Sequence, residues 1–273
     1  KKAVQEPDSE EAGYFYFRRT EDGQLPNNWY AIFGGSVWEQ LPDGRYYLHT
    51  FSKKQPDLNW ENPKLREQII GMANRWLDRG IHGFRVDAIT FIKKDLTFAD
   101  GLLSTARSND AKTKAEQGLF SIENLTNYPG IGDFLRELKA RAFAPHDAVT
   151  VAEAPGVPVE QLGEYAGEDG YFSMIFEFSY TDMHRENRDW SLKDFGERMK
   201  DAMYQSMNSG WVGTFLENHD SPRSPNKYIC EEDLQRYGDR PKKMLATLFM
   251  LLRGTSFIYQ GQEIGMTNYP FTS

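Results

Sequence analysis

The sequence predicts an α/β protein in which strands and helices alternate along most of the chain, as in a β/α barrel. From residue 62 onward, segments with apolar residues at helical spacing alternate with short apolar strands. Acidic side chains follow these strands, at the end where parallel α/β sheets carry their sites. A doubly wound open sheet shares that feature, but no strand here is followed by a G-x-G-x-x-G loop. The barrel is therefore the better prediction.

Residues 1–58 are expected to form part of a small β-rich lobe inserted in the barrel, at the N-terminal end of this chain. Short aromatic runs alternate there with turn-forming residues, at positions 14–17, 29–33 and 46–51. The sequence Pro-Asp-Gly-Arg at 42–45 separates two of these runs and is a candidate hairpin turn. The lobe is therefore expected to contain its own antiparallel strands.

Residues 59–273 are expected to form the barrel. Asn62 and Pro63 provide an N-cap and a proline at the first helical position, and Gly80 ends that helix. Strands alternating with helices in this way predict a parallel sheet. The expected strands are 82–89, 148–152, 172–178, 212–216 and 255–259, and the later helices lie near 132–143, 192–207 and 240–252.

Composition excludes several classes of partner. The net charge of -8 makes nucleic acid or an anionic membrane an unfavourable partner. No apolar run approaches the ~20 residues needed to span a bilayer. The single cysteine, Cys230, excludes an internal disulfide framework and a cysteine-based metal site, and no histidine pair has metal-ligand spacing. An aromatic content of 14% provides core residues and also flat apolar surfaces that can stack on sugar rings.

Three carboxylates follow three of the expected strands, in the segments GFRVDAI, VTVAEAP and ENHDSPR. They are Asp87, Glu153 and Asp220. Burying carboxylates beside apolar strands is costly unless they are paired or functional. Arg85 projects from the same strand face as Asp87 and can keep it ionised. Glu153 follows an apolar run and lies between two alanines, a setting that raises a carboxyl pKa and suits a general acid.

This set of residues fits cleavage of a glycosidic bond. Retaining glycosidases place a nucleophile and an acid about 5–5.5 Å apart, and a third acid can hold the distorted sugar ring. The structural alternative is an arginine–aspartate ion pair with two polar strand caps. That alternative is favoured for any one acid, whereas three acids at strand ends together with His219 favour a site.

The same segments resemble signatures of the α-amylase superfamily, glycoside hydrolase family 13, and within it the oligo-1,6-glucosidase and α-glucosidase branch. The segments QPDLNWENP (55–63) and GTSFIYQGQEIGMTN (254–268) resemble two further parts of that branch. The resemblance implies a (β/α)8 TIM barrel, with strands four to eight present in this chain. It further implies that Asp87 is the nucleophile, Glu153 the general acid/base and Asp220 the transition-state stabiliser.

The resemblance also implies four substrate-binding residues: Arg85, His219, Ala88 and Arg223. Arg85 and His219 would contact the nucleophile and the non-reducing glucose. Ala88 follows the nucleophile at a position where this branch associates Val with α-1,6 and Ala or Thr with α-1,4 linkages, so α-1,4 or mixed specificity is expected. In a pocket one methyl group is typically worth ~1–3 kcal/mol, which biases specificity without deciding it.

The implied function is that of a retaining exo-α-glucosidase acting on short oligosaccharides such as maltose or isomaltose. A cytoplasmic monomer without nucleic-acid or membrane partners is expected, with no identifiable cofactor, because the family's calcium site would lie outside this chain. Two alternatives stay open. One is a sucrose isomerase or transglucosidase on the same scaffold. The other is a non-catalytic ancillary subunit of amino-acid transporters, which the presence of all three acids disfavours.

The chain departs from the family pattern in several places. The first three barrel strands and the C-terminal β-domain are absent, and five parallel strands cannot close a barrel. The chain is therefore expected to be a fragment that is inactive and poorly folded alone, because open sheet edges expose backbone polar groups. Gln262 stands where relatives often carry Glu, and Ser256 where they often carry Pro.

Overall fold

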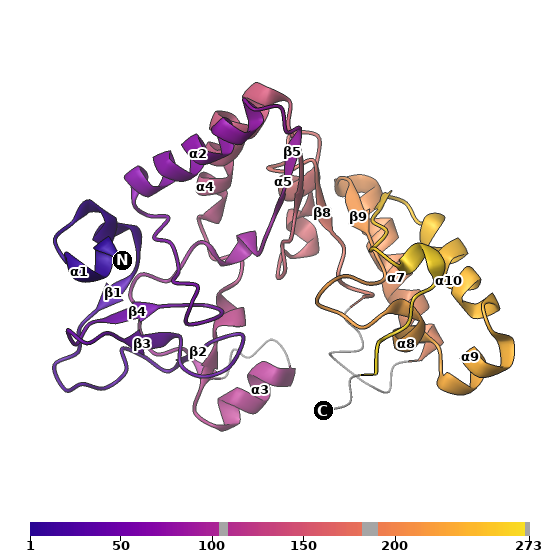
Figure 1. Ribbon diagram of the computed structural model, residues 1–273, viewed down its shortest axis with the longest axis horizontal. Coiled ribbons are helices and arrows are strands. Elements are labelled where there is room, and N and C mark those ends of the chain that lie inside the picture. Colours follow the sequence, from indigo (N-terminus) through magenta and orange to yellow (C-terminus); the bar gives the residue numbers. More distant parts are fainter. Residues whose placement is uncertain (104–108, 182–190, 271–273) are drawn as a thin grey trace. The chain divides into compact units, whose positions relative to one another are not determined.

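The computed structural model describes residues 1–103, 109–181 and 191–270, which belong to two compact units, Lys1–Val157 and Pro158–Ser273 (Figure 1). The expected division near residue 58 lies inside the first unit, and this lobe boundary stays a prediction. Among the helices within the described ranges, none is long and apolar enough to cross a membrane.

The first unit opens with a strand-rich lobe, which follows the short helix α1 (Lys2–Gln5) and the 3-10 turn η1 (Glu10–Tyr14). Strands β1 (Phe17–Arg18), β4 (Tyr46–Leu48) and β3 (Trp38–Gln40) form an antiparallel sheet in that order. At the predicted turn between β3 and β4, the Leu41 N–H donates to the Arg45 carbonyl over 2.7 Å. The predicted hairpin is confirmed.

The lobe also recruits residues from a later part of the sequence. Strand β2 (Trp29–Tyr30) pairs in parallel with β6 (Phe120–Ser121), which follows helix α3 (Asn109–Glu116). The Phe98 ring lies 5.6 Å from the Trp29 ring in the buried core, which also contains Ile122 at the start of the turn η4 (Ile122–Leu125). The hydrophobic core of the lobe is therefore built from two segments distant in sequence.

The rest of the first unit is a parallel β/α arrangement. Strands β5 (Gly83–Val86) and β7 (Val149–Ala152) pair over four positions. Gly83 permits this close approach, because a Cβ at that position would lie 1.8 Å from the Val149 carbonyl oxygen. Helices α2 (Pro63–Leu77) and α4 (Ile131–Leu138) lie side by side (Figure 1), joined by an ion pair between Arg66 and Glu137 over 2.5 Å. The expected helix at 132–143 continues past α4 as a π-helical turn, Lys139–Phe143, and a 3-10 turn, Ala144–His146.

The second unit repeats the pattern. Strand β9 (Val212–Thr214) lies between β8 (Met174–Phe176) and β10 (Thr255–Ser256) and is parallel to both. Helix α7 (Leu192–Ser209) packs through Phe195 against Leu245 and Phe249 of α10 (Arg240–Met250) in one buried cluster. The remaining elements are η7 (Val159–Gln161), α5 (Leu162–Ala166), α8 (Ser224–Tyr228), α9 (Glu231–Tyr237) and η8 (Gln262–Ile264).

The structure confirms the predicted α/β class, with the five expected strands present and paired in parallel within the two units. Each strand is shorter than the apolar run that predicted it. The clearest case is the run 82–89, where the strand ends at Val86 because the backbone turns at Ala88.

Candidate active site

The first unit brings together Arg85, Asp87 and Glu153. Val86 and Ala152 are partners at the ends of the parallel strands β5 and β7, so the next residues, Asp87 and Glu153, leave the sheet as neighbours. The Arg85 guanidinium bridges both carboxylates, with one nitrogen paired to Asp87 and Nη2 2.9 Å from Glu153 Oε2. The ion pair that the alternation of side chains predicted between Arg85 and Asp87 is therefore present.

A left-handed turn follows Asp87 and fixes Glu153. Ala88 has φ 44° and ψ 37°, a conformation that few non-glycine residues adopt. In this conformation the Ala88 N–H donates to Glu153 Oε2 over 3.3 Å. The Glu153 backbone is held as well, because its N–H donates to the Val86 carbonyl over 2.8 Å and its carbonyl accepts from the Ile89 N–H. The carboxylate of Glu153 thus has little freedom to move away from Asp87.

The two carboxylates have different environments. The Asp87 side chain is 71% exposed, whereas that of Glu153 is 19% exposed. Burial raises the pKa of Glu153 above its ordinary value near 4.5, and the neighbouring Asp87 carboxylate raises it further, against the opposing effects of Arg85 and the Ala88 N–H. The arrangement therefore raises the proton affinity of the half-buried Glu153 and leaves the Asp87 side chain largely exposed.

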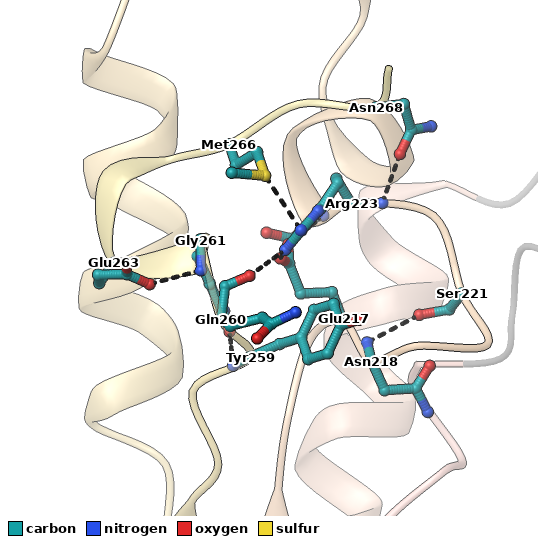
Figure 2. A network of polar contacts seen from close by, with 12 residues as sticks. Glu217, Asn218, Ser221, Arg223, Tyr259, Gln260, Gly261, Glu263, Met266 and Asn268 are labelled. Carbon is teal, nitrogen blue, oxygen red and sulfur yellow. Dashed lines mark hydrogen bonds and ion pairs between the residues drawn. The ribbon is translucent and has the colours of Figure 1, made fainter. Parts of the chain in front are cut away.

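The second unit carries His219 and Asp220 in the loop after β9. Their side chains are 58% and 55% exposed, and His219 Nε2 lies 3.1 Å from Asp220 Oδ2. The Asn218 side chain shapes the loop, because its Oδ1 accepts the Asp220 N–H over 3.0 Å. The Asn218 N–H in turn donates to Ser221 Oγ over 3.1 Å (Figure 2). A histidine and an aspartate are thus presented together at the end of a buried strand.

Arg223 was expected to bind substrate, but its guanidinium makes extensive contacts within the second unit. Nη1 lies 2.9 Å from Oε1 of Glu217 and 2.7 Å from the Gln260 carbonyl oxygen, and the group lies over the Tyr259 ring (Figure 2). Glu217 itself is almost completely buried. Glu217 was not predicted to be a site residue, although a carboxylate directly after the expected strand 212–216 was a visible signal in the sequence.

No group of three or more His, Cys, Asp or Glu side chains within the described ranges is arranged to hold a metal ion.

Comparison with known proteins indicates the family to which the chain belongs. The sequence matches the family described as alpha amylase, catalytic domain, over residues 1–272. It is 41% identical over 269 residues to the probable oligo-1,6-glucosidase 3 of Bacillus subtilis (strain 168), covering 97% of this chain and 46% of that protein. It is 42% identical over 271 residues to the oligo-1,6-glucosidase of Halalkalibacterium halodurans, covering 95% of this chain and 46% of that protein.

Among solved structures, the isomaltulose synthase of Erwinia rhapontici NX5 superposes with a TM-score of 0.88 at 32% identity, over 99% of this chain and 47% of that one. The chain thus spans about half the length of the relatives it matches. Because the family match covers nearly every residue, the chain belongs to the α-amylase family, glycoside hydrolase family 13, and contains part of its TIM barrel.

Proposed function

We propose that this chain supplies the catalytic acids of a retaining exo-α-glucosidase that hydrolyses α-1,4 or α-1,6 bonds of short oligosaccharides. The observation that carries the proposal is the Arg85-bridged pair of Asp87 and Glu153, in which one carboxylate is exposed and the other has a raised pKa. The relatives named oligo-1,6-glucosidase support the substrate class.

In this proposal Asp87 attacks the anomeric carbon while Glu153 donates its proton to the departing glycosidic oxygen. The bond between that carbon and oxygen breaks, and a glucosyl ester forms on Asp87. Glu153, now ionised, takes a proton from water, and the water attacks the anomeric carbon and displaces Asp87. Two inversions release glucose with its original configuration. Arg85 is paired with Asp87 before attack.

Asp220 is assigned to stabilise the positive charge that develops on the sugar ring in both transition states, and His219 to contact the sugar. The support for these roles is the position of both residues in the loop that follows the parallel strand β9, at the end where barrel enzymes bind substrate. Their more-than-half-exposed side chains also leave them open to a ligand.

A sucrose isomerase is the second candidate. The match to an isomaltulose synthase at a TM-score of 0.88 favours it, because an isomerase would use the same nucleophile and acid and differ in the acceptor that resolves the glucosyl ester. A non-catalytic subunit is disfavoured, because the Arg85 bridge keeps the acid pair assembled for chemistry.

The test uses the complete protein that contains this chain, incubated separately with maltose, isomaltose and sucrose, with products separated by chromatography. Glucose from maltose or isomaltose supports the glucosidase, whereas a sucrose isomer as the main product supports the isomerase. Asp87→Asn should lower kcat for every substrate by on the order of 10⁴-fold, because an amide cannot form the ester. Undiminished turnover in Asp87→Asn would overturn both candidates.

A further inference from the structure

Glu217 and Arg223 form an ion pair that is shielded from water inside the second unit. The Glu217 side chain is 0% exposed and that of Arg223 is 17% exposed, and their charged atoms lie 2.9 Å apart. Ion pairs with such burial recover their desolvation cost only when the geometry is good and the remaining polar atoms are bonded. The position of this pair, at both ends of the loop that carries His219 and Asp220, indicates its role.

The carboxylate of Glu217 closes that loop. Its two oxygens are divided between the last residues of the segment 217–224. Oε1 accepts from the Arg223 guanidinium and Oε2 accepts from the backbone N–H of Ser224. The first residue of the loop is thereby bonded to the residues at its end. His219 and Asp220 lie between these fixed points.

Arg223 then joins this loop to the loop that follows β10 (Figure 2). Its Nη1 donates to the Gln260 carbonyl over 2.7 Å, and its Nη2 lies 3.0 Å from the Met266 sulfur. The backbone N–H of Arg223 donates to Asn268 Oδ1 over 2.8 Å. The guanidinium also lies 4.7 Å from the centre of the Tyr259 ring. Arg223 therefore connects the Glu217 carboxylate, at the start of the loop after β9, with several residues of the loop after β10.

We infer that Glu217 and Arg223 are positioning residues, which hold the His219–Asp220 loop in the geometry needed for the reaction. This inference rests on the proposed function. A carboxylate that opposes developing charge is effective only when it is held in place before the reaction, and a displacement of about 1 Å can cost on the order of 10²-fold in rate. Arg223 acts on Asp220 through the loop, and its donors are directed at Glu217 and Gln260.

The inference is tested in the complete protein with Glu217→Gln, Arg223→Met and the double variant. Gln keeps the size of Glu, but its side-chain amide has only one oxygen acceptor. When that oxygen accepts from either the Arg223 guanidinium or the Ser224 N–H, the amide NH2 group faces the other donor. Each single variant should lower kcat roughly 10- to 100-fold with KM changed less than about threefold, since the transition state depends on loop geometry more than ground-state binding does. The double variant should lose no more than the worse single variant, because the two residues act as one unit.

A second measurement separates positioning from stability. Affinity for 1-deoxynojirimycin, a cationic analogue of glucose, should fall in parallel with kcat, because it reports the placement of Asp220 against positive charge. Arg223→Ala should regain part of its kcat when millimolar guanidinium chloride, far below denaturing concentrations, fills the vacated position. Arg223→Lys, which keeps the charge but cannot bond Glu217 and Gln260 together, should lose about tenfold in kcat and little in Tm.

The matched control is the pair Arg66 and Glu137, between helices α2 and α4 of the first unit. It resembles the proposed pair, with side chains 18% and 27% exposed and the Arg66 guanidinium 5.3 Å from the Phe134 ring centre. Arg66→Met with Glu137→Gln should lower Tm but leave kcat within twofold at temperatures where the protein is folded.

The outcomes distinguish a failure of the proposed function from a failure of the positioning inference. If Asp87→Asn keeps its turnover, the proposed function is wrong. If Asp87→Asn is inactive while folded Glu217→Gln and Arg223→Lys keep wild-type kcat and inhibitor affinity, only the positioning inference is wrong. Should Glu217→Gln fail to fold, Arg223→Lys and the guanidinium rescue of Arg223→Ala decide, and an unchanged kcat in Arg223→Lys overturns the inference.

Discussion

Ala88 combines a strained backbone with a functional contact. Its φ of 44° lies in the left-handed region, where β-branched side chains are genuinely unfavourable, and its N–H donates to Glu153. The residue type at this position therefore affects both the surroundings of Asp87 and the placement of the Glu153 carboxylate. Substitutions here should change specificity and stability together.

Ala88→Val in the complete protein is expected to raise the ratio of α-1,6 to α-1,4 kcat/KM by up to about tenfold, because added bulk narrows the pocket beside Asp87. The left-handed backbone should also make Val lower the unfolding free energy, because a β-branched residue is disfavoured there beyond the cost that Ala already bears. Kinetics with isomaltose and maltose, and denaturant unfolding, measure the two effects. Ala88→Gly is the control, which should relieve strain without narrowing the pocket. An unchanged or inverted ratio in Ala88→Val would place the determinant of specificity elsewhere.

Glu153 should respond to the charge of Asp87. Asp87 raises the pKa of Glu153, so Asp87→Asn is expected to lower that pKa, since Arg85 and the Ala88 N–H then act on Glu153 without an opposing carboxylate. Infrared difference spectra of the carboxyl band, recorded against Glu153→Gln, measure the titration. An equal or higher pKa in Asp87→Asn would mean that burial alone sets the protonation of Glu153.

The raised pKa of Glu153 also makes the unfolding free energy of the protein depend on pH. Folding favours the protonated form of Glu153, so its contribution is present below the ordinary pKa near 4.5 and is lost as pH rises through the higher folded-state pKa. Between these two pKa values, the unfolding free energy of the wild-type protein, measured relative to that of Glu153→Gln, should therefore fall as pH rises. Below and above this pH range the difference should stay constant. A gain of stability across the window would contradict the raised pKa.

The local sequence pattern predicted the parallel strands well, because each is a short apolar run bounded by polar residues. It overestimated their lengths, since pairing ends where the backbone turns, as at Ala88. It did not predict the pairing of β2 with β6, whose partners Trp29 and Phe120 are far apart in sequence. Such pairing depends on tertiary packing around Phe98, which no local period reveals.

The contacts of the candidate site were likewise predicted only in part from the sequence. The contact between Arg85 and Asp87 followed from the alternation of side chains in a strand. The burial of Glu217 against Arg223 did not, because a polar residue after a strand reads equally well as a solvated cap. The contact between Glu217 and Arg223 depends on how the loops after β9 and β10 pack together, and local sequence pattern does not predict that packing.

The lobe is attached to the segment after β5 by a buried ion pair. Lys94 is 3% exposed, and its Nζ lies 2.8 Å from Asp57 Oδ2 and 2.9 Å from Thr50 Oγ1. Lys94→Met should lower the unfolding free energy of the complete protein by about 3–5 kcal/mol, because Asp57 is left buried without its partner. Denaturant unfolding monitored by tryptophan fluorescence measures this loss.

The control is Lys53→Met, which removes an ion pair to Glu39 whose lysine is 69% exposed. Exposed pairs contribute little, so its unfolding midpoint should match that of the wild-type protein. Equal losses in Lys94→Met and Lys53→Met would show that the buried pair does not anchor the lobe.

Across the whole protein, the proposed catalytic roles are divided among acids that are spread along the sequence. Asp87 and Glu153 belong to the first unit and Asp220 to the second, and the chain spans about half the length of its relatives. Kinetic loss on mutation would be seen for any of these residues. Only the identity of the residue that bonds to the sugar separates the nucleophile from the others.

The direct measurement is mass spectrometry of the complete Glu153→Gln protein incubated with α-glucosyl fluoride, whose leaving group needs no acid. The ester on Asp87 should form and persist, because the base that activates water is gone. Added azide should release α-glucosyl azide, with the configuration retained through two inversions. A glucosyl group mapped by proteolysis to Asp87 is the predicted result. A glucosyl group on Asp220 or another acid, or β-glucosyl azide as the product, would contradict the account.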